Sequence, residues 1–386
     1  MRIANRLKNL PPYFFVGVNR KVAEKRAAGV DIVDLSMGNP DLAPPAYIIE
    51  ALYRAAQNPA YHGYAGYYGI PAFREAVAEW YGSRFGVELD PAKEVLALIG
   101  SKEGIVNTTL ALVDSGDVAL TADPGYPTYR MGTIMAGGEP FPLPLLREND
   151  FLPDLSLIPD EVARRAKIIW FNYPNNPTGA TATLDFFAQV IDFAREYDIV
   201  VVHDNPYCEL TFEGYVAPSF LEVPGAKEVG LELNSLSKTY NMAGWRIGMA
   251  VGNEEVIAAL ARTKSNVDSG IFRPLQEAAV VALTGDQGWI PERNEIYQRR
   301  RDIMLEGLEA AGIEAEKPKG GLYIWAEVPE GYTSVEFFDK LLEEIGVVVA
   351  PGSEYGQYGE GYMRISLTSP EERLQLAAER LAEFRF

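Results

Sequence analysis

Short apolar runs of strand length alternate with helical patterns along most of this chain, and that alternation restricts the possible folds more than any other feature of the sequence. The runs lie at residues 95–99, 118–121, 168–171, 199–203, 230–233 and 249–251. Nearly continuous apolar strands that alternate with helices are typical of a parallel sheet with helices on both faces. We therefore expect an α/β fold with a mostly parallel, doubly wound sheet.

The C-terminal part of the chain follows a different pattern. Residues 292–311, after Pro291, combine spaced apolar residues with many charges, which predicts one long amphipathic helix that ends at Gly312. Further strand-length runs at 322–325, 347–350 and 363–366 indicate a smaller α+β unit. Because 386 residues exceed the usual size of one compact core, we expect two domains.

Composition narrows the possible partners and locations. The formal net charge of −19 argues against nucleic acid or an anionic membrane as a partner, so an anionic ligand would need a local basic pocket. The single cysteine, Cys208, excludes an intramolecular disulfide and fits a reducing cytoplasm. With only His62 and His203, a multi-histidine metal site is not expected. The sequence has no signal peptide pattern and no run of membrane-spanning length, so we expect a cytoplasmic protein.

The segment 235–248 places one lysine, Lys238, among two serines and an arginine. An amine is a useful nucleophile only when part of it is neutral, so a catalytic lysine needs burial or a nearby cation, here Arg246, to lower its pKa. Serine hydroxyls and a guanidinium group suit a phosphate. A lone loop lysine is more often a solvated residue, but this combination predicts a site that forms a Schiff base with a phosphorylated aldehyde.

The same segment resembles a signature of the class I/II aminotransferases, which use pyridoxal phosphate on the fold-type-I scaffold. The matching residues are Ser235, Ser237, Lys238, Gly244, Arg246 and Gly248. The resemblance implies that Lys238 is the catalytic residue and the covalent anchor of pyridoxal phosphate, with Ser235, Ser237 and Arg246 around the cofactor. It also implies a seven-stranded sheet in a large domain at 49–285. An N-terminal arm, residues 1–48, then joins the long connecting helix and C-terminal segment, residues 286–386, in a small domain.

Polar residues follow two of the expected strands. Asp204 ends the run 199–203 and precedes Tyr207, and ligands of parallel sheets bind beyond the carboxyl ends of strands. A helix cap is an equally good explanation of such an aspartate. The family pattern implies that Asp204 pairs with the pyridine nitrogen and Tyr207 with the ring's phenolic oxygen. The turn-rich segment 172–179 follows another run, and its Asn176 is implied to bind that oxygen and the substrate carboxylate.

Three further segments have cofactor roles by the same resemblance. The turn 100–104 opens a helical pattern whose first amides suit an anion, and the family implies that Ser101 and Lys102 hold the phosphate. Tyr126, between Gly and Pro at a strand end, is the candidate for stacking on the ring rather than a core aromatic. Tyr64 is implied to reach the phosphate of a partner subunit, which makes the protein a homodimer with shared active sites.

Arg364 stands alone among apolar neighbours on an expected strand. A buried arginine requires a structural carboxylate or a bound anion. We favour the ligand, because the family uses this position to bind the substrate α-carboxylate, with the backbone near Gly38 opposite it. Tyr13, in the segment 11–15, is expected on the substrate side as well.

The implied function is transfer of an amino group from an L-amino acid to a 2-oxo acid in amino acid biosynthesis, with ping-pong kinetics. Segments 11–15, 100–104 and 239–245 resemble the subgroup of LL-diaminopimelate and glutamate-pyruvate (alanine) aminotransferases, with glutamate and 2-oxoglutarate as the expected second pair. Some diaminopimelate enzymes carry an acidic residue where this chain has Tyr67 and Tyr68. A C–S β-lyase on the same fold and a non-catalytic aminotransferase-like sensor remain as alternatives, the second disfavoured because the chain retains Lys238, Asp204 and Arg364.

Overall fold

A seven-stranded sheet forms the centre of the larger part of the molecule, in the computed structural model that describes residues 3–8, 10 and 14–386. Across the sheet the strands are β2 (Val95–Leu98), β8 (Gly248–Gly252), β7 (Gly230–Ser235), β6 (Val200–Asp204), β5 (Ala166–Phe171), β3 (Val118–Asp123) and β4 (Glu139–Pro144). Strand β8 is antiparallel to both of its neighbours, and the other pairs are parallel. The expected α/β fold with a mostly parallel seven-stranded sheet is confirmed.

Strand β4 is the strand that the apolar runs did not reveal, because three of its six residues are proline. Proline cannot donate a ladder hydrogen bond, so a proline-rich segment normally argues against a strand except at a sheet edge. Here β4 lies at the edge beside β3, and Glu139 N and Leu145 N donate hydrogen bonds toward β3, to Asp117 O and Asp123 O. The alternating prolines therefore interrupt none of these inward bonds.

Helices cover both faces of the sheet. Successive side chains of a strand point to opposite faces, and because both sets are apolar here, both faces must be buried. In β5, Ile168 and Trp170 pack on one side of the sheet, while Ile169 and Phe171 pack on the other. The first side is covered by α5 (Ser101–Leu112), α6 (Thr128–Ala136) and α11 (Glu254–Lys264). The larger core on the other side includes residues of α3 (Ala46–Ala56), α4 (Pro71–Phe85), α8 (Leu184–Tyr197) and α12 (Arg273–Thr284). Shorter helices are α1 (Asn5–Lys8), α7 (Asp160–Ala163), α9 (Ala226–Val229) and α10 (Leu236–Thr239).

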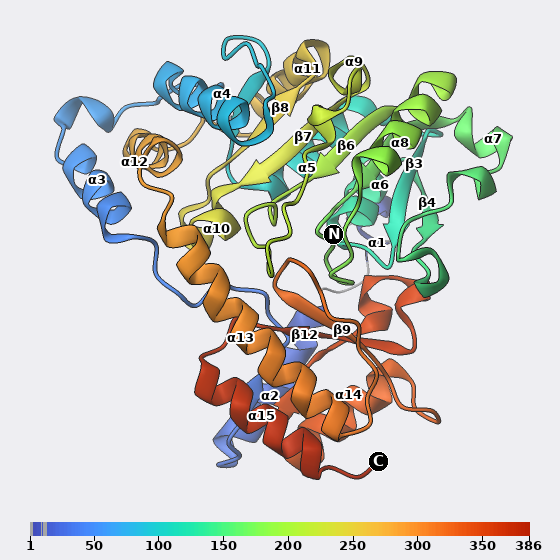
Figure 1. Cartoon of the computed structure of the whole chain (residues 1–386). Helices are drawn as coiled ribbons and strands as arrows, with labels where there is room; N and C mark the ends of the chain where they lie inside the picture. The colour runs from blue at the N-terminus through green and yellow to red at the C-terminus, as the bar shows by residue number, and fades with distance from the viewer. Residues whose placement is uncertain (1–2, 9, 11–13) are drawn as a thin grey trace.

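A second hydrophobic core lies below the sheet in Figure 1. Its three-stranded sheet has the order β11 (Ala350–Pro351), β12 (Tyr362–Ser366) and β9 (Tyr323–Glu327), and β1 (Val33–Asp34) pairs with β10 (Val347–Val348). Helices α2 (Phe14–Ala27), α14 (Ser334–Ile345) and α15 (Glu371–Glu383) complete this part. Tyr207, Leu210 and Phe212 also pack in this second core. The domain limits at 48/49 and 285/286 stay predictions.

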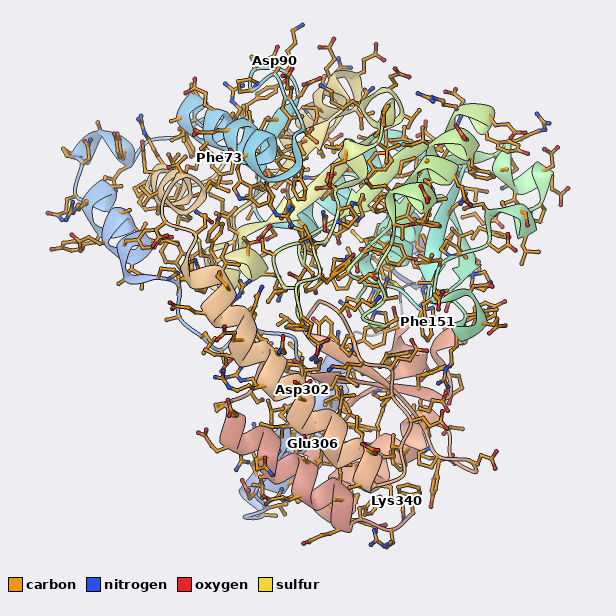
Figure 2. All side chains as sticks on the ribbon, in the orientation of Figure 1. Phe73, Asp90, Phe151, Asp302, Glu306 and Lys340 are labelled. Atoms are coloured by element: carbon orange, nitrogen blue, oxygen red, sulfur yellow. The ribbon has the colours of Figure 1, made fainter. Side chains whose placement is uncertain are left out.

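Helix α13 (Trp289–Ala310) runs from the larger part into the smaller one. It begins before Pro291 rather than after it, because proline is tolerated in the first turn of a helix, where its missing N–H has no partner to lose. Figure 2 shows Asp302 and Glu306 along this helix and Phe73 in the larger part. No helix in the described part of the chain is long and apolar enough to cross a bilayer.

Candidate active site

A cavity of about 490 Å³ lies where the carboxyl ends of the central strands meet the smaller part of the molecule. The predicted site residues that line it are Gly38, Ser101, Lys102, Tyr126, Asn176, Asp204, Tyr207, Ser235, Ser237, Lys238, Arg246 and Arg364. Tyr64 does not line it and is 92% exposed on the surface. Tyr13 lies outside the described residues. Five of the lining residues are lysine or arginine, so the basic pocket expected within this acidic chain is present.

Lys238 sits in α10, directly after strand β7, and its Nζ donates a hydrogen bond to Gly38 O at 2.5 Å. Burial lowers the pKa of Lys238; Tyr323 opposes this effect, and the charges of Arg364 and Arg246 add to it. Arg246, the cation expected from the sequence, therefore contributes less than burial and Arg364. A lowered pKa favours the neutral amine, which is the form of lysine that acts as a nucleophile or a base.

The main chain of Lys238 is held by a residue that sequence reasoning missed. Arg293 of α13 is buried, and its guanidinium donates to Lys238 O at 2.8 Å, Thr239 O at 2.5 Å and Glu209 O at 2.6 Å. The carbonyls of Lys238 and Thr239 lie at the C-terminal end of α10. The helix dipole makes a cation favourable at that end. The expected amphipathic helix contains Arg293, but the sequence does not indicate which of its charges turns inward.

Asp204 ends strand β6 and has one oxygen bonded and one open. Tyr129 Oη donates to Oδ2 at 2.7 Å, whereas Oδ1 is buried and has no hydrogen bond partner in the described part of the chain. Burial raises the pKa of Asp204 to about 6, although the Tyr129 hydrogen bond and His203 oppose the rise. A buried open acceptor is costly unless a ligand supplies a donor, and a protonated ring nitrogen of pyridoxal phosphate is such a donor.

Serine hydroxyls, a helix N-terminus and Arg246 meet at one end of the cavity. Gly100 precedes α5 with φ of +75°, and a Cβ added there would lie 2.3 Å from Arg246 Nη2, so only glycine lets the guanidinium approach this turn. Arg246 Nη1 lies 3.4 Å from Ser237 Oγ, and Ser235 Oγ accepts from Ser237 N at 3.2 Å. Free amides, hydroxyls and a guanidinium suit a phosphate dianion.

Arg364 projects from β12 and is almost completely buried. Its Nη1 donates to Asn176 Oδ1 at 2.9 Å, and its Nη2 donates to Ser36 O at 2.5 Å. The rings of Tyr323 and Tyr355 lie 4.1 and 4.9 Å from its guanidinium carbon. Both of these acceptors are neutral oxygens, and they fix the orientation of the guanidinium in the cavity.

Rigid polar loops hold the remaining predicted residues. Asn176 N donates to Asn172 Oδ1 at 2.7 Å, and Asn172 Nδ2 donates to Asp204 O at 2.6 Å, so the two strand-end loops are joined. The hydroxyls of Tyr207 and Tyr323 lie 3.3 Å apart, and burial raises the pKa of Tyr207 well above its usual value. Lys102 Nζ lies 5.9 Å from the ring centroid of Tyr126.

Sequence reasoning missed three tyrosines of the site, Tyr129, Tyr323 and Tyr355. Tyr129 lies in the first turn of α6, three residues after Tyr126, which precedes the helix, and the two ring centroids are 5.8 Å apart. This short separation in sequence was the available signal. Tyr323 begins β9 after two glycines. Nothing in its local sequence separates it from an ordinary strand residue.

Together, the lysine amine of lowered pKa, the open carboxylate oxygen, the turn at the start of α5 and the buried guanidinium fit pyridoxal phosphate chemistry. The chain belongs to the aminotransferase class I and II family, which matches over residues 30–381. Members of this family use pyridoxal 5′-phosphate, and the chain is accordingly a transaminase of amino acid biosynthesis.

Known relatives resemble the chain over nearly its full length. An LL-diaminopimelate aminotransferase of Moorella thermoacetica is 54% identical over 99% of this chain and 98% of its own. One from Aquifex aeolicus is 52% identical over 99% of both chains. Among solved structures, substrate-bound BacF from Bacillus subtilis superposes with a TM-score of 0.95 at 41% identity, covering 99% and 98%. A single mutant of Thermus thermophilus aspartate aminotransferase gives 0.93 at 34% identity, covering 99% of each. The lyase and sensor alternatives gain no support from these relatives.

Proposed function

We propose that this transaminase moves an amino group from LL-diaminopimelate to a 2-oxo acid, with glutamate and 2-oxoglutarate as the second substrate pair. The observation that carries a reaction of this kind is the buried Lys238 amine in the same cavity as the buried Arg364 guanidinium. The first can exchange with an amino group, and the second can orient the α-carboxylate beside it. The choice of diaminopimelate is supported by relatives of that name at more than half identity over nearly the whole chain.

The cofactor roles proposed for the cavity residues follow their chemistry. We assign the ring nitrogen to Asp204, ring stacking to Tyr126, and the ring's phenolic oxygen to Tyr207 and Asn176. The phosphate is assigned to Ser101, Lys102, Ser235, Ser237 and Arg246. When bound, pyridoxal phosphate supplies an aldehyde that takes up an amino group and a ring that withdraws electrons from the carbon bearing it.

Lys238 would act as the base that removes the proton of the substrate's α-carbon and as the acid that delivers it to the carbon on the far side of the substrate nitrogen. Burial lowers the pKa of Lys238 and so favours the neutral form that this role needs. Arg364 and Asn176 orient the α-carboxylate, with the Gly38 backbone on the other side. Asp204, kept ionised near neutral pH by a ring N–H, stabilises the positive charge of that nitrogen. Two half-reactions in one cavity give ping-pong kinetics.

Opposite charges in the cavity wall support a substrate with a charged group at each end. Arg130 and Glu354 line the same cavity as Lys238, and no hydrogen bond or ion pair joins these two to each other in the described part of the chain. Burial raises the pKa of the half-buried Glu354, against the opposing effect of Arg130. We assign Glu354 to the distal ammonium group and Arg130 to the distal carboxylate of diaminopimelate. Glu354 would then supply the acidic group that Tyr67 and Tyr68 do not.

A shared active site is proposed as well. Exposed apolar side chains lie on two segments of the chain, residues 64–68 and 267–272. The two segments are in contact, because a Cβ added at Gly270 would lie 2.2 Å from Gly66 O. The exposed apolar side chains are Tyr64, Tyr67, Tyr68, Val267 and Phe272. Large exposed apolar patches mark interaction sites, and a second copy of this chain would cover them and let Tyr64 reach the partner's phosphate. Sedimentation of the protein as a monomer would contradict this. We further propose a cytoplasmic location, which fits a chain with a single cysteine, the buried Cys208.

The test is the visible spectrum of the protein with pyridoxal phosphate, recorded after single additions of LL-diaminopimelate, glutamate or alanine. LL-diaminopimelate and glutamate should each bleach the band of the lysine-bound cofactor, and 2-oxoglutarate should restore it. The matched control, Lys238→Ala, should form no such band. A band that bleaches with alanine but not with LL-diaminopimelate would refute the substrate assignment, and a band that no donor changes would refute transamination.

A selective variant tests the distal assignment. Glu354→Gln should lower kcat/KM for LL-diaminopimelate relative to glutamate by about fivefold, the value of one half-exposed charge pair of about 1 kcal/mol. An equal loss with both donors would contradict a distal role for Glu354.

A further inference from the structure

Asp123 joins the larger part of the molecule to a loop of the smaller part. It is the last residue of β3, and its carboxylate accepts two hydrogen bonds from the backbone of the loop 352–359. Tyr358 N donates to Oδ1 at 3.0 Å, and Gln357 N donates to Oδ2 at 3.2 Å. Hydrogen bonds from amides to a charged acceptor are stronger than those to a neutral one. The loop is therefore docked on the carboxyl end of β3.

Gly356 makes the close contact with Asp123 possible. Its φ of +140° lies in a region that residues with a side chain rarely adopt, and a Cβ added there would lie 2.0 Å from Asp123 Oδ1. One residue earlier, Tyr355 O accepts a hydrogen bond from Gly125 N at 2.9 Å. Any side chain at position 356 would therefore push the loop away from the end of β3.

The loop 352–359 is a compact unit made of two short helical turns. A Cβ added at Gly352 would lie 2.0 Å from Gly359 O, so the two ends of the loop are in contact. On its other side, the loop is held by the first residue of α14, since Ser334 Oγ donates to Ser353 Oγ at 2.9 Å. Because the loop is closed on itself, an anchor at one point sets the position of the whole loop.

The loop carries two side chains of the cavity wall. Glu354, assigned to the distal ammonium group of the substrate, lines the cavity, and the ring of Tyr355 lies 4.9 Å from the Arg364 guanidinium carbon. Arg130, assigned to the distal carboxylate, comes from α6, the helix that follows β3. The contact at Asp123 therefore brings the two residues assigned to the distal end of the substrate to a fixed separation.

We propose that Asp123 determines specificity for the distal end of the substrate by holding the loop 352–359 against β3, an inference that rests on the proposed function. Asp123 does not line the cavity, so it acts through Glu354 and is a positioning residue. Attraction between charges weakens with distance. Without the contact, the enzyme loses its selection for a distal ammonium group, while the α-amino group of a substrate still reacts.

The test is a double-mutant cycle on the cofactor-loaded enzyme. Steady-state kinetics give kcat/KM for LL-diaminopimelate and for glutamate, and the reading is the ratio of the two values, because glutamate has no distal ammonium group. Asp123→Asn removes the charge that accepts the two amides, Glu354→Gln removes the group through which Asp123 acts, and the double variant combines them. A residue that acts only through Glu354 has no effect on the ratio once that carboxylate is gone.

A second variant reaches the same contact from the loop. Gly356→Ala leaves Asp123 in place and displaces the loop with its Cβ. Two matched controls change the same residue types elsewhere. Asp154→Asn alters a carboxylate that also accepts a backbone amide, from Ser156 at 2.9 Å, and Gly331→Ala alters a glycine with a φ of +93° and open space around it. Neither control residue lines the cavity.

We expect Asp123→Asn and Gly356→Ala each to lower the ratio about three- to fivefold, mainly through a higher KM for LL-diaminopimelate, and the controls to leave it unchanged. In the Glu354→Gln background, Asp123→Asn should change the ratio less than about twofold. An unchanged ratio in both single variants, or a double variant whose loss is the product of the single losses, would overturn the positioning role. An unaltered enzyme that does not transaminate LL-diaminopimelate, or a ratio that Glu354→Gln leaves unchanged, would instead refute the proposed function.

Discussion

Replacing Asp204 by asparagine should make the cofactor-free protein more stable and the enzyme nearly inactive. Asp204 is an acid whose pKa is about 6 in the folded protein, against an ordinary value of 3.8, because burial disfavours its charge. Between those two values the folded state binds more protons than the unfolded state. The free energy of unfolding therefore falls as the pH rises through this window, and it stays low above about pH 6.

The size of the effect follows from the two pKa values. At about 1.4 kcal/mol for each factor of ten in the dissociation constant, the difference corresponds to about 3 kcal/mol. The Asp204→Asn side chain keeps its shape, remains neutral at every pH and still accepts the hydrogen bond from Tyr129 through its amide oxygen. Above pH 6, the free energy of unfolding of the Asp204→Asn variant should therefore exceed that of the unaltered protein by up to about 3 kcal/mol. Below about pH 4 the two proteins should be equally stable.

The assay is urea unfolding of the cofactor-free proteins from pH 4 to pH 8, with Asp192→Asn on the exposed face of α8 as the matched control. That control should show no pH-dependent gain. Pyridoxal phosphate should reverse the order, because its ring nitrogen gives Asp204 the partner that the open oxygen lacks. Activity of Asp204→Asn should fall at least about 100-fold, since a charge that stabilises the transition state is lost. A stability difference that is constant with pH would refute this reasoning.

Three further perturbations test other parts of the site. Gly100→Ala should raise the Kd for pyridoxal phosphate about tenfold, because the added Cβ would meet the Arg246 guanidinium and because residue 100 has a positive φ. Equilibrium dialysis measures this Kd, and an unchanged Kd would contradict the prediction. Arg293→Met should lower the melting temperature and kcat together, since the carbonyls of Lys238 and Thr239 lose the donor that Arg293 supplies. A full kcat would exclude a role in holding Lys238. Arg364→Lys should lower kcat/KM about 100-fold, because a lysine has no second nitrogen with which to form a bidentate contact. Steady-state kinetics with glutamate measure this loss, and a loss of less than threefold would contradict the prediction.

Most of the predicted residues that line the cavity follow a strand whose apolar run is visible in the sequence. Asp204, Asn176 and Tyr126 lie at the carboxyl ends of three parallel strands, and the fold brings such ends together at one edge. The spacing around Lys238 was specific enough to identify its neighbours as well. Their places in the cavity followed from the fold class, whereas their roles came from a family resemblance.

The residues that were missed depend on contacts between distant segments. Arg293 meets the carbonyl of Lys238 across 55 positions of the chain, and Tyr323 meets Tyr207 across 116. Each is one of many similar residues in an ordinary helix or strand, so the local sequence gives no sign of what it touches. Strand β4 was missed for a different reason, because its local sequence is misleading. Its three prolines argue against a strand, yet the segment pairs with β3 as a parallel edge strand.

Those prolines have a consequence for how copies of the protein meet one another. They occupy alternate positions, Pro140, Pro142 and Pro144, and these are the positions that face away from β3. The outer rim of β4 consequently presents carbonyl oxygens but no amide donor, and a strand from another molecule cannot complete a ladder along it. At the opposite edge, Ala97 N of β2 already donates to Tyr68 O. The β4 edge is thus closed to further growth and part of the β2 edge is already occupied, which opposes edge-to-edge aggregation.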